Sequence, residues 1–539
     1  MNKKILFIFI FTFINNVFCT LVENNLKNES EELNMIDIQI APKRFWENDV
    51  EGYIFLLQEN IEDSSEIEKI ESEYYPNLRE ILKKHKFKGG KKDSFVLTAT
   101  KNEKLIQLIF VGLGKVDGLW STELENLRRA VGRAVKSIKK LEIESSVLDV
   151  PYLKELEVDI DEVVKQITVA GIMADYEFIK FKTAKDIKDW HGKLLLSVND
   201  VDKKDCEKSL IEGIIIGRAT NFTRSLADLP PNILTPAVLA QEAKNMAVEL
   251  NLKCTIFGRA EAEKLGMGGF LAVDEGSDKE GKFVVLEYWC GKKDARTIAL
   301  VGKGVTFDSG GVSLKPPANM TGMKYDMSGA AGVLGVIKAI AQIKPNVNVI
   351  SVTPLVENMP SGKSSRQDDI ITFMNGKTAE IQNTDAEGRL ILADALCYAE
   401  KNYNPDVMID VATLTAACVY ALGHFFTGLM TKNKELEESL IESAMLTGDR
   451  VWPLPFDDDF KPAIESDVAD IANTGKPNYK AGTVTAGWFL SNFVDKSKWA
   501  HLDIAGTSDG VPGIDYIDSK CSAGAAVRLL INFILNYEK

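Results

Sequence analysis

Histidine is scarce in this chain of 539 residues, and no two of its four histidines share a helical turn or a metal-ligand spacing: His85, His191, His424 and His501. A zinc site of the HExxH type needs two imidazoles on one helix face, and a cysteine-rich structural zinc site needs paired thiolates. The seven cysteines form no CxxC pair. These absences exclude both kinds of site, so a bound metal would need mostly oxygen ligands.

Positive charge is also short, with 64 Lys and Arg against 78 Asp and Glu and a formal net charge of −14. Non-specific nucleic-acid binding depends on basic surfaces, so we expect no nucleic-acid partner. The cysteines lack the regular spacing of a disulfide framework, which predicts reduced thiols. A hydrophobic content of 45% and a charged content of 26% are ordinary for a globular enzyme.

Long apolar runs are missing except at the N-terminus. Lys3 and Lys4 precede an apolar run over 5–14, and Cys19 lies at a possible cleavage point. This pattern is typical of an export signal and is too short for a stable membrane span. We therefore predict a signal-like leader at 1–19 and a polar spacer at 20–35, with export to a periplasm or secretory pathway. The alternative is that translation begins at Met35.

Two stretches of alternating strand and helix patterns predict an α/β protein of two domains. In the first, 36–195, apolar runs predict strands at 52–57, 94–97 and 108–111, and amphipathic patterns predict helices at 122–141 and 160–174. We expect this smaller N-terminal α/β domain to be followed by a linking segment.

The linking segment, 196–230, contains a predicted helix at 205–228 that ends before Pro230 and Pro231. The alternation then restarts and continues to the end of the chain. It predicts a larger catalytic α/β domain over 231–539, with a central mixed sheet flanked by helices.

Four acidic residues lie at predicted ends of strands and helices in this larger domain. Asp308 follows a predicted strand at 297–301, and Asp326 precedes a predicted helix that reaches residue 343. A hairpin over 370–382, with a type I′ turn at Asn375-Gly376, leads to Asp385 and Glu387. In an extended segment, residues i and i+2 point the same way, so these last two carboxylates would face one side.

Such close carboxylates need protons or cations, and four of them suit a pair of divalent ions. Two lysines, Lys303 and Lys315, flank the acids in apolar surroundings. A lysine beside cations can lose its proton and become a metal ligand, while a charged one can polarise a carbonyl. The alternatives are that Asp326 caps the following helix and that the acids are solvated loop residues.

The run Asn-Thr-Asp-Ala-Glu-Gly-Arg-Leu at 383–390 resembles the signature of the leucine aminopeptidase family, also called cytosol aminopeptidases. Further motifs that resemble the family follow the same order along the chain, at 301–311, 357–362, 448–452, 468–471 and 499–506. The resemblance extends over roughly 225–539.

This resemblance implies a leucyl aminopeptidase with two divalent ions per subunit, Mn²⁺ or Zn²⁺. Asp308 and Glu387 would bridge both ions, Lys303 and Asp326 would complete the tighter site, and Asp385 the more exchangeable one. A hydroxide activated by both metals would attack the peptide bond after the N-terminal residue.

The resemblance also assigns the remaining site residues. Lys315 would assist at the scissile carbonyl, and Arg389 would hold a bicarbonate ion that serves as general base. The pocket for the first substrate residue, apolar and suited to leucine, would be lined by Met323, Thr413, Leu414 and Ala416. His501 lies in a family motif, and we expect it to be a core histidine hydrogen-bonded near Asp503.

The family implies peptide substrates, a homohexamer and a cytoplasmic location, which conflicts with the leader. Two functional alternatives stay open. The chain could be another two-metal hydrolase, such as a phosphoesterase, or the same peptidase with an added regulatory role in DNA binding. A catalytically inactive scaffold is disfavoured because every implied ligand is present.

Overall fold

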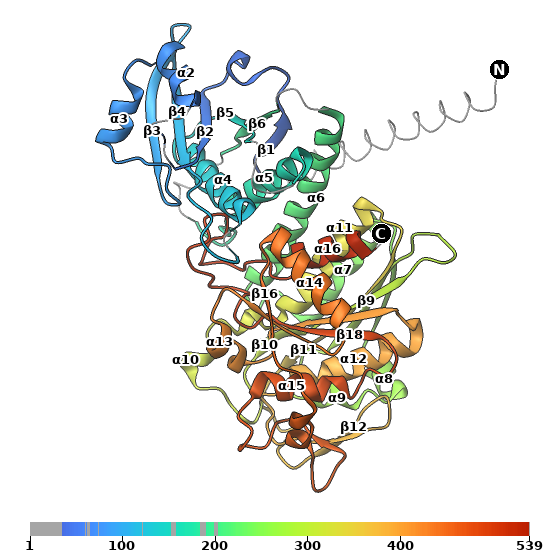
Figure 1. The fold of residues 1–539 in the computed structure, drawn as a ribbon. Coiled ribbons are helices and arrows are strands. Elements are labelled where there is room, and N and C mark those ends of the chain that lie inside the picture. Colours follow the sequence, from blue (N-terminus) through green and yellow to red (C-terminus); the bar gives the residue numbers. More distant parts are fainter. Residues whose placement is uncertain are drawn as a thin grey trace, which may run out of the picture. The chain divides into compact units, whose positions relative to one another are not determined.

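The computed structural model describes residues 35–59, 61, 65–73, 75–120, 122–151, 158–183, 190–198 and 203–537. The predicted leader and nearly all of the predicted spacer lie outside these residues. The contacts divide the chain into two compact units: Met1–Asp117 with Asn126–Ile214, and Gly118–Glu125 with Ile215–Lys539 (Figure 1). Helix α6 (Lys203–Asp228) contains the division between Ile214 and Ile215 and covers most of the predicted linking segment.

The N-terminal unit is built on a six-stranded sheet in the order β1-β6-β5-β2-β4-β3, parallel except for the antiparallel pair β3–β4. Its strands are β1 (Asp37–Ile40), β2 (Gly52–Leu57), β3 (Ser94–Lys101), β4 (Lys104–Gly112), β5 (Ser145–Asp149) and β6 (Lys193–Ser197). Its helices are η1 (Phe45–Glu47), α2 (Ser65–Glu73), α3 (Leu78–Lys84), α4 (Glu123–Lys140) and α5 (Ile160–Asp175). The strands and helices predicted for this domain are confirmed, with β3 and β4 longer than expected.

The second unit, called the catalytic unit after the domain predicted for 231–539, contains a mixed nine-stranded sheet in the order β16-β15-β18-β14-β9-β11-β8-β7, with β10 paired to β11. Its strands are β7 (Lys253–Phe257), β8 (Lys282–Tyr288), β9 (Thr297–Gly302), β10 (Gly304–Asp308), β11 (Asn348–Asn358), β14 (Val407–Ala412), β15 (Thr427–Thr431), β16 (Val451–Pro453) and β18 (Lys498–Asp503). A small sheet joins β12 (Ile370–Thr372), β13 (Thr378–Glu380) and β17 (Ile471–Ala472).

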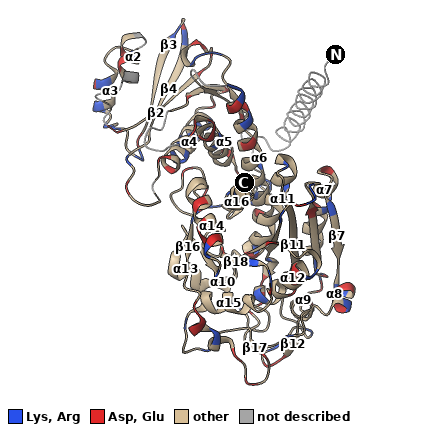
Figure 2. Cartoon of the chain, turned by 45° about the vertical axis from the view of Figure 1, so that its right-hand side comes forward, with Lys and Arg blue, Asp and Glu red and all other residues tan. Residues whose placement is uncertain are grey.

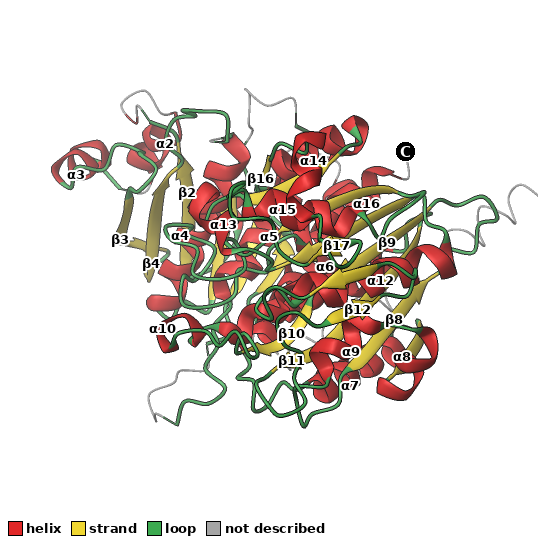
Figure 3. Ribbon diagram, turned by 90° about the horizontal axis from the view of Figure 1, so that it is seen from below, coloured by secondary structure: helices red, strands yellow, loops and turns green. Residues whose placement is uncertain are grey.

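Helices flank both faces of the large sheet, as predicted (Figure 3). The helices of this unit after α6 are α7 (Pro236–Glu249), α8 (Arg259–Leu265), α9 (Gly268–Asp274), α10 (Pro317–Met320), η3 (Met323–Met327), α11 (Ser328–Ile343), α12 (Gly388–Tyr403), α13 (Ala416–Leu422), α14 (Lys434–Thr447), η4 (Asp458–Ile464), α15 (Gly482–Ser491) and α16 (Val527–Tyr537).

The sheet forms two cores because successive side chains of a strand point to opposite faces. In β8, Phe283 and Val285 belong to the cluster that includes side chains of α9 and α12, whereas Val284 and Leu286 belong to the cluster with α7 and α11. All eleven residues of β11 are buried, as expected for a strand inside a sheet that is covered on both faces.

A break in strand pairing sets the position of Lys303. Strand β9 ends at Gly302 and β10 begins at Gly304, and the Lys303 amide between them donates to Val411 O across the sheet at 3.0 Å. Gly302 lets α11 approach at this point, because a Cβ there would lie 2.6 Å from Gly329 O. The close approach brings the start of α11, and η3 before it, to the end of β9.

The hairpin between β12 and β13 forms as predicted, but the predicted turn type is wrong. A type I′ turn needs positive φ at both central residues, and Asn375 has none; only Gly376 does, with φ 86°. Gly376 N donates to Phe373 O at 2.8 Å, and Phe373 N donates to Lys377 O at 2.9 Å. The hairpin loop is therefore longer than the two-residue loop of a type I′ hairpin. It consists of a turn followed by a glycine in the left-handed region.

One helical stretch among the described residues, Met323–Ile343, is long and apolar enough to cross a membrane, but 89% of it is buried within the protein. It packs as the core helix α11. Acidic and basic residues are interspersed over both units (Figure 2). Four of the described cysteines are free thiols: Cys254, Cys290, Cys397 and Cys418.

Candidate metal centre

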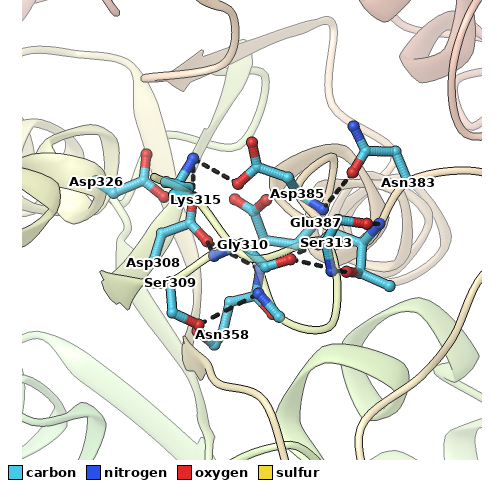
Figure 4. A network of polar contacts seen from close by, with 12 residues as sticks. Asp308, Ser309, Gly310, Ser313, Lys315, Asp326, Asn358, Asn383, Asp385 and Glu387 are labelled. Atoms are coloured by element: carbon cyan, nitrogen blue, oxygen red, sulfur yellow. Dashed lines mark hydrogen bonds and ion pairs between the residues drawn. The ribbon is translucent and has the colours of Figure 1, made fainter. Parts of the chain in front are cut away.

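Four carboxylates from different segments of the catalytic unit converge at one end of the large sheet (Figure 4). Asp308 ends β10, Asp326 lies in η3, and Asp385 and Glu387 precede α12. Oxygens of Asp308, Asp385 and Glu387 lie within 4.8 Å of one another. Asp326 joins this group through Lys303, whose Nζ lies 2.8 Å from Asp326 Oδ1 and 2.9 Å from Glu387 Oε1.

One local expectation about these acids and one alternative to the metal site are wrong. The segment from Asp385 to Glu387 is not extended: Asp385 lies in a turn, and Glu387 has helical angles (φ −79°, ψ −36°) as the N-cap of α12. The carboxylates converge because the chain turns there, not because of strand alternation. Asp326 does not cap α11 either, since the N-cap is Met327 and Asp326 Oδ1 accepts a hydrogen bond from Thr413 Oγ1 at 2.8 Å.

Each predicted lysine lies between two of the carboxylates. Lys303 Nζ also donates to Thr413 O at 2.8 Å, and Lys315 Nζ lies 2.8 Å from Asp308 Oδ2 and 2.5 Å from Asp385 Oδ1. Burial alone would lower the pKa of Lys303, but the Asp326 and Glu387 carboxylates raise it above its usual value. The pKa of Lys315 is raised in the same way, chiefly by Asp308. Both ammonium groups therefore keep their protons beside these carboxylates.

Burial makes this concentration of negative charge costly. It raises the pKa of Asp326 well above its usual value despite Lys303, and it raises the pKa of Asp308, with Glu387 adding to the effect. Burial and the neighbouring Asp308 raise the pKa of Asp385. Bound protons or cations therefore stabilise the site relative to a state in which its carboxylates are ionised and unpaired.

The donor atoms fit divalent cations. Asp326 Oδ2 and Glu387 Oε2 are buried and accept no hydrogen bond from any described residue. Buried anionic oxygens without donors are unfavourable unless a cation contacts them. Four carboxylates and one amine also form an oxygen-rich ligand set suited to hard or borderline divalent ions.

Residues outside the predicted site hold the acids in place. Asn358 Nδ2 donates to Asp308 Oδ1 at 2.8 Å and to Thr384 O at 3.0 Å, so it ties the end of β11 to two loops that carry acids. Thr384 Oγ1 donates to Gly310 O at 2.7 Å and links the same loops again. Asn358 lies in the motif at 357–362, and its position at the end of an apolar strand is the signal that could have identified it.

Arg389 is buried beside the acids with part of its hydrogen-bonding capacity unused. Its Nη1 donates to Asn473 O at 2.7 Å, while its Nε is buried without a partner in the described chain. Burial lowers the pKa of Arg389 to about 10, so the guanidinium stays charged at neutral pH. A buried cationic donor of this kind fits a small anion such as bicarbonate.

The predicted pocket residues lie on segments next to the acids. Met323 begins the same 3₁₀ turn as Asp326, and Thr413 contacts Asp326 directly. Leu414 is half-buried, and Ala416 is exposed as the first residue of α13.

His501 is a fully buried core histidine, as expected, and the structure identifies its hydrogen-bond partner. Its Nδ1 lies 2.5 Å from Asp410 Oδ1, on the neighbouring strand β14, because β14 and β18 pair in a register that places Asp410 opposite His501. Asp503 instead accepts hydrogen bonds from Leu414 N and Thr415 Oγ1.

Comparisons with known proteins identify the family that this chain resembles. Residues 221–531 match the model of the cytosol aminopeptidase family, catalytic domain, and residues 54–185 that of the same family's N-terminal domain. A probable cytosol aminopeptidase of Nitrosospira multiformis is 39% identical over 85% of this chain and 87% of its own length. One from Vesicomyosocius okutanii is 49% identical over 62% of this chain and 68% of its own length.

Solved structures of the bottromycin maturation enzyme BotP are also similar. One has a TM-score of 0.78 at 28% identity, covering 91% of this chain and 99% of BotP. The other, BotP in complex with Mn, has a TM-score of 0.79 at 27% identity, covering 91% of this chain and 100% of BotP.

Replacing Gly388 by alanine tests the packing around Lys303. A Cβ at Gly388 would lie 2.5 Å from Lys303 Cε and 2.7 Å from Nζ, so Gly388→Ala must displace the amine. We expect the peptidase rate to fall at least about tenfold, because small displacements of catalytic groups are costly. The control is Gly332→Ala in α11, where a Cβ would only touch Ala525 O at 3.4 Å. A full rate in Gly388→Ala, measured beside the control, would contradict this account.

Proposed function

The chain belongs to the cytosol aminopeptidase family and is a metal-dependent aminopeptidase, and we propose that it releases leucine and other bulky apolar residues from the N-termini of peptides. The observation that carries the proposal is the convergence of four carboxylates and two lysines in one site at the end of the sheet. Such a site can bind cations and a carbonyl oxygen together.

Two divalent ions, which we propose to be Mn²⁺ or Zn²⁺, would polarise the scissile carbonyl and lower the pKa of the attacking water when bound. Lys303 and Asp326 would hold one ion and Asp385 the other, with Asp308 and Glu387 contributing to both. The unpartnered oxygens of Asp326 and Glu387 support this division. To act as a ligand, Lys303 must give up the proton that its carboxylate neighbours stabilise.

Lys315 and Arg389 are the proposed catalytic residues. Lys315, kept charged by Asp308 and Asp385, would stabilise the negative charge that develops on the carbonyl oxygen. Arg389 would hold a bicarbonate ion through its guanidinium, whose Nε has no partner among the described residues, and this anion would accept the proton of the attacking water.

Selection of an N-terminal residue follows from the same site. A free amine at the substrate's N-terminus can join the ligands of one ion, and an internal peptide bond has no such amine. Met323, Thr413, Leu414 and Ala416 would line the apolar pocket for the first side chain. The contact of Thr413 with Asp326 supports a pocket that begins beside the proposed ions.

We propose that the protein assembles as a homohexamer. Large apolar side chains are exposed on two segments beside the site, Val312 and Leu314 before Lys315 and Tyr420 and Phe425 after Ala416. Exposed apolar groups near one another mark interaction surfaces, and an assembly would cover them.

We propose a cytoplasmic location, as the names of the similar proteins suggest for them. The free thiols of Cys254, Cys290, Cys397 and Cys418 support a reducing compartment. The N-terminal residue of the protein isolated from its own cells tests this proposal. Met1 or Met35 is the expected result, and Thr20 would establish cleavage of the leader and export.

Removing metal should abolish the activity. We expect a chelator to stop hydrolysis of leucine p-nitroanilide, and added Mn²⁺ or Zn²⁺ to restore it, because the water and the carbonyl both depend on the ions. Turnover of phosphoesters without turnover of peptides would instead identify another two-metal hydrolase.

Asp385→Asn is the matched genetic control for this experiment. It keeps the size of the side chain and removes one anionic ligand, so we expect the rate to fall by orders of magnitude while native mass measurement still finds the hexamer. An unchanged rate would remove Asp385 from the site.

A further inference from the structure

Asp228, the last residue of α6, contacts the turn that carries Asp326. Tyr325 Oη donates to Asp228 Oδ1 at 2.9 Å, and Lys324 Nζ donates to Asp228 O at 2.7 Å. Both donors belong to the two residues that precede Asp326 in η3. Asp228 is only 1% exposed, and its two donor residues Lys324 and Tyr325 are half-buried.

The turn itself offers little rigidity. A 3₁₀ helix has weaker hydrogen-bond geometry than an α-helix, and η3 is five residues long and follows Gly322 in the left-handed region (φ 92°). On the sheet side, Thr413 Oγ1 donates to Asp326 O at 3.2 Å and to Oδ1 at 2.8 Å. On the opposite side of the turn, Asp228 holds Lys324 and Tyr325. The position of Asp326 therefore depends on both Thr413 and Asp228.

Asp228 is itself held in one orientation. Ser522 N donates to the same Oδ1 at 2.8 Å, and the fully buried Arg224 donates from Nε to Ser522 O at 2.8 Å. The carboxylate therefore cannot rotate to follow a moving Tyr325 without leaving a buried amide unsatisfied. Because the Asp228 carboxylate is fixed, its hydrogen bond also fixes the position of the Tyr325 hydroxyl.

We propose that Asp228 is a positioning residue for the metal ligand Asp326, acting through the Tyr325 hydroxyl and the Lys324 amine. The inference rests on the proposed role of Asp326 as a ligand of the tighter site. Groups that orient metal ligands typically change metal affinity by about 10- to 100-fold when they are removed.

The test compares two tyrosine-to-phenylalanine substitutions, each of which removes one hydroxyl that donates a hydrogen bond to a carboxylate. Tyr325 Oη donates to Asp228 at 2.9 Å, and Tyr403 Oη donates to Glu287 Oε1 at the same distance of 2.9 Å in a part of the catalytic unit away from the acids. Tyr325→Phe should raise the Kd of the tighter site for Mn²⁺ by about tenfold or more, measured by titration of the chelator-treated full chain. Tyr403→Phe should leave this Kd unchanged.

Thermal unfolding of the chelator-treated variants separates positioning from stability. Both tyrosine variants should lose similar stability, because each loses one hydrogen bond of the same kind. Asp228→Asn, which keeps an oxygen acceptor, should bind Mn²⁺ more tightly than Asp228→Ala.

Asp326→Asn distinguishes the possible failures. If it abolishes tight binding while Tyr325→Phe binds Mn²⁺ like the unchanged protein, the positioning role of Asp228 is wrong and the ligand assignment stands. If Asp326→Asn also leaves tight binding intact, the proposed ligand role of Asp326 is wrong, and the inference about Asp228 falls with it.

Discussion

The catalytic unit depends on one constraint, the electrostatic repulsion among four carboxylates in a largely buried site. Two unit charges about 4 Å apart repel by roughly 4 kcal/mol at the effective dielectric constant near a protein surface. Oxygens of Asp308, Asp385 and Glu387 lie within 4.8 Å of one another, and Asp326 is joined to them through Lys303. No fold would gather these groups without positive charge to hold them. The scarcity of histidine fits this arrangement, since the proposed metal ligands are carboxylates and one amine rather than imidazoles.

The positive charge reaches the acids where regular secondary structure is interrupted. Lys303 reaches the acids because β9 and β10 are separate strands with one residue between them. Gly388 leaves room for the Lys303 side chain at the start of α12. The acids themselves come from the ends of elements, where the backbone turns away from the sheet, and this is where open α/β sheets bind their ligands. The deeply buried strands and helix α11 give these ends a rigid base.

The sequence was sufficient to predict both α/β domains, the main strands and helices, and the residues that the structure brings together around the acids. Periodicity and turn residues carry that information locally. It was not sufficient for the geometry. The predicted extended run from Asp385 to Glu387 is a turn, and Asn375 does not adopt the left-handed angles of the expected hairpin turn. The sequence also did not identify Asp410 as the partner of His501. These features depend on strand register and on contacts between segments far apart in the chain. The same reason hides Asp228, which no local pattern marks as a support of the site.

The central claim is that these four carboxylates bind two divalent ions. Anomalous diffraction from crystals grown with Mn²⁺ tests it most directly. The account predicts two peaks per chain, one contacted by Asp326 and Lys303 and the other by Asp385, with Asp308 and Glu387 contacting both. A single peak, or peaks away from these residues, would contradict it.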